Sequence, residues 1–213
     1  MKDCVNDTRT MEGTGINKQI KRNWYFTLAF IACLSCNSNF VPKPKGYFAI
    51  DLPKKEYQVF DQPGYPYTFE YPVYASIVKD TTFFGGTTEN PWWININFPQ
   101  FNSRIYVSYI QISEKRKLDK LINDAFTLTN KHTSKASSID DSLINTPNNV
   151  HGMLFKVGGN VATANQFFVT DSVKNFLRGA LYFDATPNAD SLGIVDDYLL
   201  LDMKHIINSF KWK

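Results

Sequence analysis

The sequence is poor in the residues that build metal centres, disulfides and acid–base sites. Its 213 residues include only three cysteines and three histidines: Cys4, Cys33, Cys36, His132, His151 and His205. The histidines do not have metal-ligand spacing, and H-E-x-x-H does not occur. Neither Gly85-Gly86 nor Gly158-Gly159 has the flanking residues of a phosphate loop or a dinucleotide fingerprint. The sequence therefore predicts that the protein binds no metal and no cofactor. Its histidines are expected to be structural or solvated.

The sequence also lacks a recognisable catalytic set. Asp171, Ser172 and His151 are the residue types of a hydrolase, but Ser172 lies in a predicted hairpin turn and lacks a G-x-S-x-G elbow. The adjacent acids of Asp140-Asp141 and Asp196-Asp197 have diverging side chains, so we expect a loop for the first pair and a helix N-terminus for the second. These patterns predict that the protein is not an enzyme.

Neither sign of charge dominates. The chain has a formal net charge of +3, and removing the five basic and three acidic residues of positions 1–35 leaves 18 basic and 17 acidic residues. This balance gives no electrostatic reason to expect nucleic acid as a partner. Hydrophobic residues make up 43% and charged residues 20%, which indicates a globular domain with its own core.

The N-terminal apolar run is too short to cross a bilayer. Residues 24–35, WYFTLAFIACLS, follow the basic segment NKQIKRN and lead at once into polar residues. An apolar run of about twelve residues in this order is typical of a secretory signal peptide. We therefore predict a signal peptide over residues 1–35, with translation starting at Met1 or at Met11.

Cys36 is the expected lipidation site. It lies at the apolar-to-polar boundary and follows the small Ser35, whereas Cys33, the alternative, would leave Leu34 in the mature terminus. With Cys36 as the first mature residue, no other cysteine remains in the chain, and acylation caps its thiol. Two or more acyl chains on one cysteine would give a durable membrane anchor.

Residues 36–66 are predicted to be the lipid anchor and a Pro-rich tether. Six of the ten prolines lie between positions 42 and 72. Proline fixes φ and removes a backbone donor, so VPKPKG is expected to be extended.

The remaining residues, 67–213, are predicted to form a single α+β domain. Alternating and turn-bounded apolar patterns predict strands over residues 92–98, 104–112, 151–157, 162–170 and 175–183. Apolar residues at helical spacing predict helices over 114–130, with Ser113 as N-cap, and over 193–210, after a loop at 187–191. We expect a mostly antiparallel sheet that is covered by the two helices on one face.

Arg178 is the most unusual charge in the predicted domain. It lies in the middle of the 175–183 strand, next to Leu177 and near Phe176 and Leu181. Two structural interpretations remain open: its side chain points to solvent, or it pairs with a buried acid such as Asp171.

Several segments, in this order and spacing, resemble the gliding motility lipoprotein GldD family. They are VPKPKGYF, FEYPVYA, WWININFPQFNSRIYVSY, NKHTSKASSI, NQFFVTDSVKNFLRGALYF, PNADSL and SFKWK. The resemblance covers nearly the whole mature chain. It implies a lipid-anchored cell-envelope protein that is required for gliding in bacteria whose gliding apparatus is coupled to type IX secretion. It implies other gliding-machinery proteins as partners, and no known enzymatic activity.

Two function hypotheses follow. The first is a non-catalytic component of the gliding and type IX secretion machinery that acts through protein contacts. The alternative is a periplasmic binding module or enzyme for a small molecule or glycan. A flat aromatic patch would favour the first, and a deep apolar pocket with convergent polar groups the second. Because residues 37–40, NSNF, contain no acid after Cys36, we expect a periplasm-facing protein, on the outer membrane rather than the inner.

Overall fold

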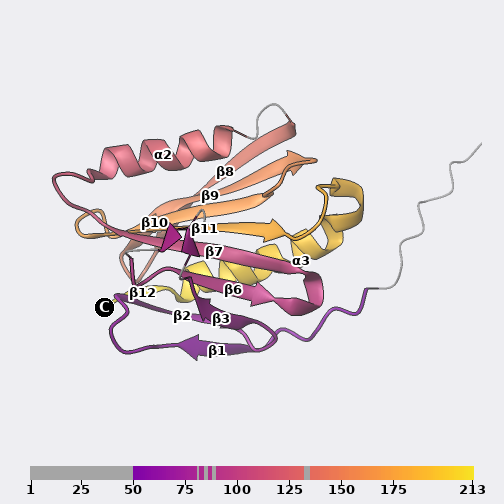
Figure 1. Ribbon diagram of the computed structural model, residues 1–213, viewed down its shortest axis with the longest axis horizontal. Coiled ribbons are helices and arrows are strands. Elements are labelled where there is room, and N and C mark those ends of the chain that lie inside the picture. The colour runs from indigo at the N-terminus through magenta and orange to yellow at the C-terminus, as the bar shows by residue number, and fades with distance from the viewer. Residues whose placement is uncertain (1–49, 81, 84–85, 88–89, 132–134) are drawn as a thin grey trace, which may run out of the picture. The chain divides into compact units, whose positions relative to one another are not determined.

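The computed structural model describes residues 50–213, apart from residues 81, 84–85, 88–89 and 132–134 (Figure 1). The predicted signal peptide, Cys33, Cys36 and residues 36–49 of the predicted tether lie outside the described residues. In the part of the chain that is described, no helix is long and apolar enough to cross a membrane.

The domain is α+β, as predicted. Its strands are β1 Tyr57–Phe60, β2 Tyr67–Pro72, β3 Ser76–Lys79, β4 Thr82–Phe83, β5 Gly86–Thr87, β6 Ile94–Phe98, β7 Ser103–Gln111, β8 Ala136–Thr146, β9 Val150–Gly159, β10 Asn165–Thr170, β11 Asn175–Phe183 and β12 Lys211–Trp212. Its helices are the short 3₁₀ turn η1 Pro99–Phe101, α2 Leu118–Asn130 and α3 Ala189–Ser209.

Seven strands form the main sheet, in the order β3-β6-β7-β11-β10-β9-β8. Every pairing in it is antiparallel, which confirms the predicted sheet type. The predicted meander is β9, β10 and β11, and the alternating 92–98 segment is β6, whose Ile94, Ile96 and Phe98 are buried. A second sheet has the order β1-β2-β12 and packs its Tyr67 and Phe69 into the same core.

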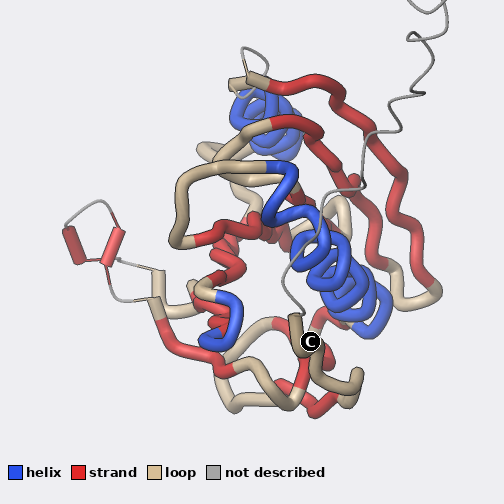
Figure 2. Tube along the Cα trace, turned by 90° about the vertical axis from the view of Figure 1, so that its right-hand side faces the viewer, coloured by secondary structure: helices blue, strands red, loops and turns tan. Residues whose placement is uncertain are grey.

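The two helices cover opposite faces of the main sheet, not one face. Phe167 and Val169 of β10 lie in the core cluster of α3, whereas Phe168 between them lies in the cluster with Leu121 and Ala125 of α2. Neighbouring residues of a strand point to opposite faces, so the helices must lie on different sides. All six residues of β10 are buried for this reason. Figure 2 shows the sheet curving around α3 with α2 outside the curve.

Both helices begin at positions other than those predicted. The α2 helix begins at Leu118 because Ser113 and Arg116 exchange backbone hydrogen bonds in a tight turn, so Ser113 is not the N-cap. The α3 helix begins within the predicted loop, at Ala189. Asn188 caps it by accepting hydrogen bonds from the backbone N–H groups of Asp190 and Ser191.

The folded domain also begins earlier than residue 67. Residues Tyr57–Phe60, expected in the tether, form β1 and pair with Phe69–Pro72 of β2. The Phe60 side chain is buried in the main core. The tether therefore does not extend to residue 66.

Candidate functional site

The α2 helix covers only part of its face of the sheet. Cross-strand register places Arg178 of β11 opposite both Phe168 of β10 and Ser108 of β7, hence on the α2 face. The α2 cluster reaches β11 at Phe176 but contains no residue of β11 beyond it. Figure 1 shows β11, β7 and β6 passing below α2 with no helix drawn in front of them.

We call the uncovered part of this face the open face. It is formed by Asn95, Arg104, Tyr106, Gln166, Arg178 and Tyr182. The Tyr106 side chain is 40% exposed, and its ring meets that of Tyr182 edge to face with 5.4 Å between centroids. The guanidinium of Arg104 lies 5.7 Å from the centre of the Tyr106 ring and 3.5 Å from the Asp184 carboxylate. Tyr and Arg are the residue types enriched in protein-binding hot spots.

Arg178 at the centre of the open face has a neutral partner. Its Nη2 donates a hydrogen bond to Oε1 of Gln166, and it forms no ion pair with any described residue. Burial lowers the pKa of Arg178, against a smaller raising effect of Tyr182. The guanidinium is thus partly desolvated, and no carboxylate of the described residues compensates its charge.

Asp171, the predicted partner of Arg178, has a different role. Its Oδ1 accepts hydrogen bonds from the backbone N–H groups of Val173, Lys174 and Asn175, and its Oδ2 accepts one from the Asn175 side chain. Burial alone would raise the pKa of Asp171, but these hydrogen bonds outweigh burial and lower it. The predicted Arg178–Asp171 pair is therefore wrong, and Asp171 shapes the β10–β11 turn.

Two buried polar atoms of the open face have no hydrogen-bond partner among the described residues. They are Oδ1 of Asn95 and Nε2 of Gln166. Gln166 is only 1% exposed and supplies the acceptor for Arg178. Both atoms are buried, so a partner that docks on the open face would contact Arg178, Tyr106 and Arg104 and not these two atoms.

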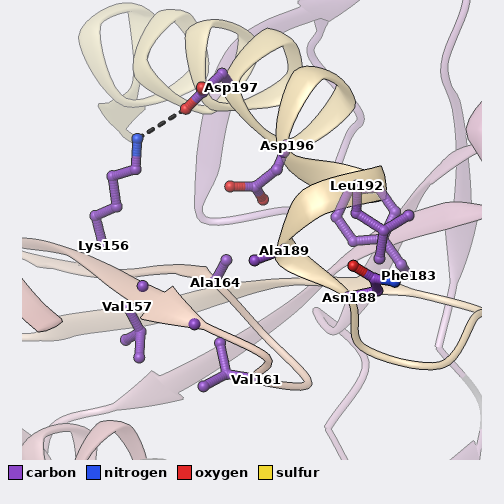
Figure 3. A pocket seen from close by; sticks show the side chains of 13 residues that line it. Lys156, Val157, Val161, Ala164, Phe183, Asn188, Ala189, Leu192, Asp196 and Asp197 are labelled. Atoms are coloured by element: carbon purple, nitrogen blue, oxygen red, sulfur yellow. Dashed lines mark hydrogen bonds and ion pairs between the residues drawn. The ribbon is translucent and has the colours of Figure 1, made fainter. Parts of the chain in front are cut away.

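A separate cavity lies at the N-terminal half of α3 (Figure 3). It has a volume of ≈ 190 Å³ and is bounded by β9, the β9–β10 connection, Phe183 and the first two turns of α3. Val157, Val161, Ala164 and Leu192 give it apolar walls. Figure 3 shows the Asp196 carboxylate pointing from α3 into this space.

Asp196 is buried with one hydrogen-bond donor. It is 8% exposed, and its Oδ1 accepts from Nδ2 of Asn165 at 2.7 Å. Burial raises the pKa of Asp196 to about 6, with a further raising effect of Asp197 and opposing effects of Asn165 and Lys156. Asp197 instead pairs with Lys156 at 2.7 Å. Because α3 begins at Ala189, the two acids lie in its second and third turns and not at the helix N-terminus that the sequence suggested.

A polar cluster that sequence reasoning missed joins the start of the domain to α3. Asp202, 0% exposed, lies 2.7 Å from the Lys55 ammonium and accepts hydrogen bonds from the hydroxyls of Tyr57 and Tyr74. Lys55 also donates to the Tyr198 carbonyl at 2.9 Å. One signal was available, because Asp202 interrupts the apolar stripe of the predicted helix.

The histidines are engaged in local contacts where the structure describes them. His151 lies 3.1 Å from Oδ1 of Asn149, and His205 lies 2.7 Å from Glu70 and stacks on Tyr57. His132 lies outside the described residues. Across residues 50–213 with the gaps named above, no group of three or more His, Cys, Asp or Glu side chains is placed to hold a metal ion.

Comparison with known proteins gives one family. The family model described as gliding motility lipoprotein GldD matches residues 37–212. No curated protein matches the chain. Among solved structures, the chain is similar to cyanobacterial PsbP (CyanoP) from Synechocystis sp. PCC 6803, with 14% identity over 78% of this chain and 98% of that chain and a TM-score of 0.39. The family match spans most of the sequence, and the chain therefore belongs to the gliding motility lipoprotein GldD family.

Proposed function

We propose that this gliding motility lipoprotein is a non-catalytic component or assembly factor of the gliding and type IX secretion machinery, and that it acts by binding another envelope protein through the open face. Family membership supports the role in gliding and the lipid anchor. The open face supports binding as the mode of action.

The observation that carries this proposal is the uncompensated guanidinium of Arg178. Its hydrogen-bond partner, Gln166, carries no charge, and the guanidinium keeps further donors for a ligand. Arginine recognises carboxylates through two parallel N–H···O bonds, and a partly desolvated site strengthens such a pair. We therefore infer that the partner is a protein that presents an Asp, a Glu or a terminal carboxylate to the open face, with Tyr106 and Tyr182 packing around the contact.

We also propose where the lipid anchor holds the domain. Lipid on Cys36, or on Cys33 as the alternative, would hold the domain at a membrane, and we propose the periplasmic side of the outer membrane rather than the inner. Protease added to intact cells should then leave the protein whole, because the outer membrane shields it. Digestion of the protein in intact cells would place it on the cell surface instead.

Gliding speed of single cells tests the binding mode. Arg178→Gln removes the guanidinium fork and should abolish or strongly reduce gliding at normal protein level. Tyr106→Ser changes a side chain that is already 40% exposed and should reduce gliding with little effect on folding. Arg116→Gln is the matched control, because Arg116 is exposed in the turn before α2. Normal gliding of folded, correctly localised Arg178→Gln and Tyr106→Ser cells would contradict the proposal.

A further inference from the structure

We infer that the cavity beside α3 is a binding site for a small protonated amine with an apolar body. The inference does not depend on the proposed protein contact, because the cavity involves neither Arg178 nor Tyr106. The site is defined by Asp196 at its inner wall and by Val157, Val161, Ala164 and Leu192 around it (Figure 3).

The carboxylate of Asp196 supplies the recognition group. A carboxylate has about four lone-pair sites, and Asp196 receives one hydrogen bond, from Asn165 to its Oδ1. Its Oδ2 has no donor among the described residues, although the residue is more than nine-tenths buried. A ligand that brings several N–H donors would satisfy the acceptor side of this site.

The charges around Asp196 favour a cation over an anion. Lys156 of β9 is the cation that faces this region, and its ammonium is bound to Asp197 at 2.7 Å. Asp140 of β8 lies opposite Lys156 in the register and adds a further negative charge. Two carboxylates at the cavity and one ammonium leave a net charge of −1 when all are ionised. An ammonium group in the cavity would neutralise it, and a carboxylate ligand would be repelled.

The walls and the volume set the size of the ligand. A cavity of ≈ 190 Å³ accommodates a few carbon atoms beside an ammonium group, and its lining offers alkyl side chains for them. Binding sites for small molecules commonly combine apolar walls with a few placed polar groups, as here. The selected class is therefore a short primary alkylamine in its protonated form.

Isosteric ligands test the inference. The purified full-length lipoprotein in detergent micelles is titrated with n-butylammonium chloride, n-butanol or sodium butyrate, and binding is followed by calorimetry. Butylammonium should bind saturably, with at least tenfold higher affinity than butanol, and butyrate should not bind. Because the pKa of Asp196 is about 6, butylammonium affinity should fall about tenfold from pH 7.5 to pH 5.0, while the amine itself stays protonated.

Three variants locate the binding. Asp196→Asn keeps the shape of the side chain and should lower butylammonium affinity at least tenfold. Gly193→Leu should block the cavity, because Gly193 lines it and a Cβ at this position would meet no atom within 4 Å. Lys156→Gln should raise the affinity, since it removes the competing cation. Asp124→Asn, on the exposed side of α2, is the control and should leave the affinity unchanged.

Several outcomes would overturn the inference. They are equal binding of butanol and butylammonium, no saturable binding of butylammonium at millimolar concentration, or unchanged affinity in both Asp196→Asn and Gly193→Leu. Circular dichroism of each variant confirms that it is folded. The two proposals can be tested separately. If the Asp196→Asn strain glides normally although its purified protein no longer binds the amine, the proposed protein contact at the open face is unaffected.

Discussion

The Lys55 ammonium lies 2.7 Å from the Asp202 carboxylate, across 147 positions of sequence, and ties the segment before β1 to the middle of α3. Asp202 is fully buried, and its carboxylate is in contact with Lys55 and accepts hydrogen bonds from the hydroxyls of Tyr57 and Tyr74. Burial lowers the pKa of Lys55, and the contacts with Asp202 oppose this effect. The pair makes the residues before β1 part of the folded domain.

Lys55→Met should therefore lower the free energy of unfolding by about 3 kcal/mol, because it leaves a buried carboxylate without its cation. Urea unfolding of the purified protein measures the change. Lys54→Met is the matched control: Lys54 is 86% exposed beside Glu56, so its loss should cost less than about 0.5 kcal/mol. Equal effects of the two substitutions would show that the Lys55–Asp202 pair contributes nothing to stability.

Asp196 should make the domain less stable as pH rises from about 4 to about 6. Its pKa is about 6 in the folded chain against an ordinary value of 3.8, so the unfolded chain loses its proton first. This difference corresponds to about 3 kcal/mol of stability that is present below pH 3.8 and lost above pH 6. Asp196→Asn should remove this contribution and raise the melting temperature at pH 7.5 more than at pH 4. An equal change at both pH values would mean that the Asp196 carboxyl titrates normally.

Two residues of the hydrolase set considered in the sequence, His151 and Ser172, should be dispensable for gliding. His151→Ala removes a contact with Asn149, and Ser172→Gly suits the positive φ of 65° at this turn position. Both variants should accumulate to normal levels and glide at normal speed. A folded, correctly localised variant of either kind that cannot glide would reopen the enzyme hypothesis.

Cys36→Ser should abolish labelling with a radioactive fatty acid and release the protein from the membrane fraction. The reason is that serine cannot carry the thioether-linked lipid of a lipoprotein. Cys33→Ser is the matched control and should leave labelling unchanged. Labelling that persists in Cys36→Ser and disappears in Cys33→Ser would assign the anchor to Cys33.

Local patterns were enough to predict the central strands. Strand β6 alternates apolar and polar residues and ends at Pro99, and β10 and β11 are separated by turn residues that include Asp171. Strand β8 was missed because most of its residues, ASSIDDSLINT, are polar, as is common for the exposed edge of a sheet. The prediction of a loop at Asp140-Asp141 is therefore wrong, because both residues lie in β8. Strand β1 was missed because the surrounding prolines suggested an extended tether.

Contacts between residues that are far apart in the sequence could not be predicted from the local sequence patterns. Both helices show an apolar stripe, but a stripe does not say which face of the sheet it covers, and α2 and α3 cover opposite faces. The sequence singled out Arg178 as an unusual charge within a strand, and Arg178 lies in β11. Its partner Gln166 follows from the register of β10 with β11, which places the two side chains on the same face.

Photocrosslinking from the open face tests the central claim most directly. A benzophenone amino acid replaces Tyr106 in the full-length lipoprotein of gliding cells, and a second strain carries it in place of Val59, which is 63% exposed on β1. We expect one discrete crosslinked protein from position 106, none from position 59, and loss of the position 106 product when Arg178→Gln is added. Two results would contradict the claim that the protein acts by binding a partner through Arg178 on the open face. One is the absence of a crosslinked product from position 106, and the other is a product that persists at the same yield when Arg178→Gln is added.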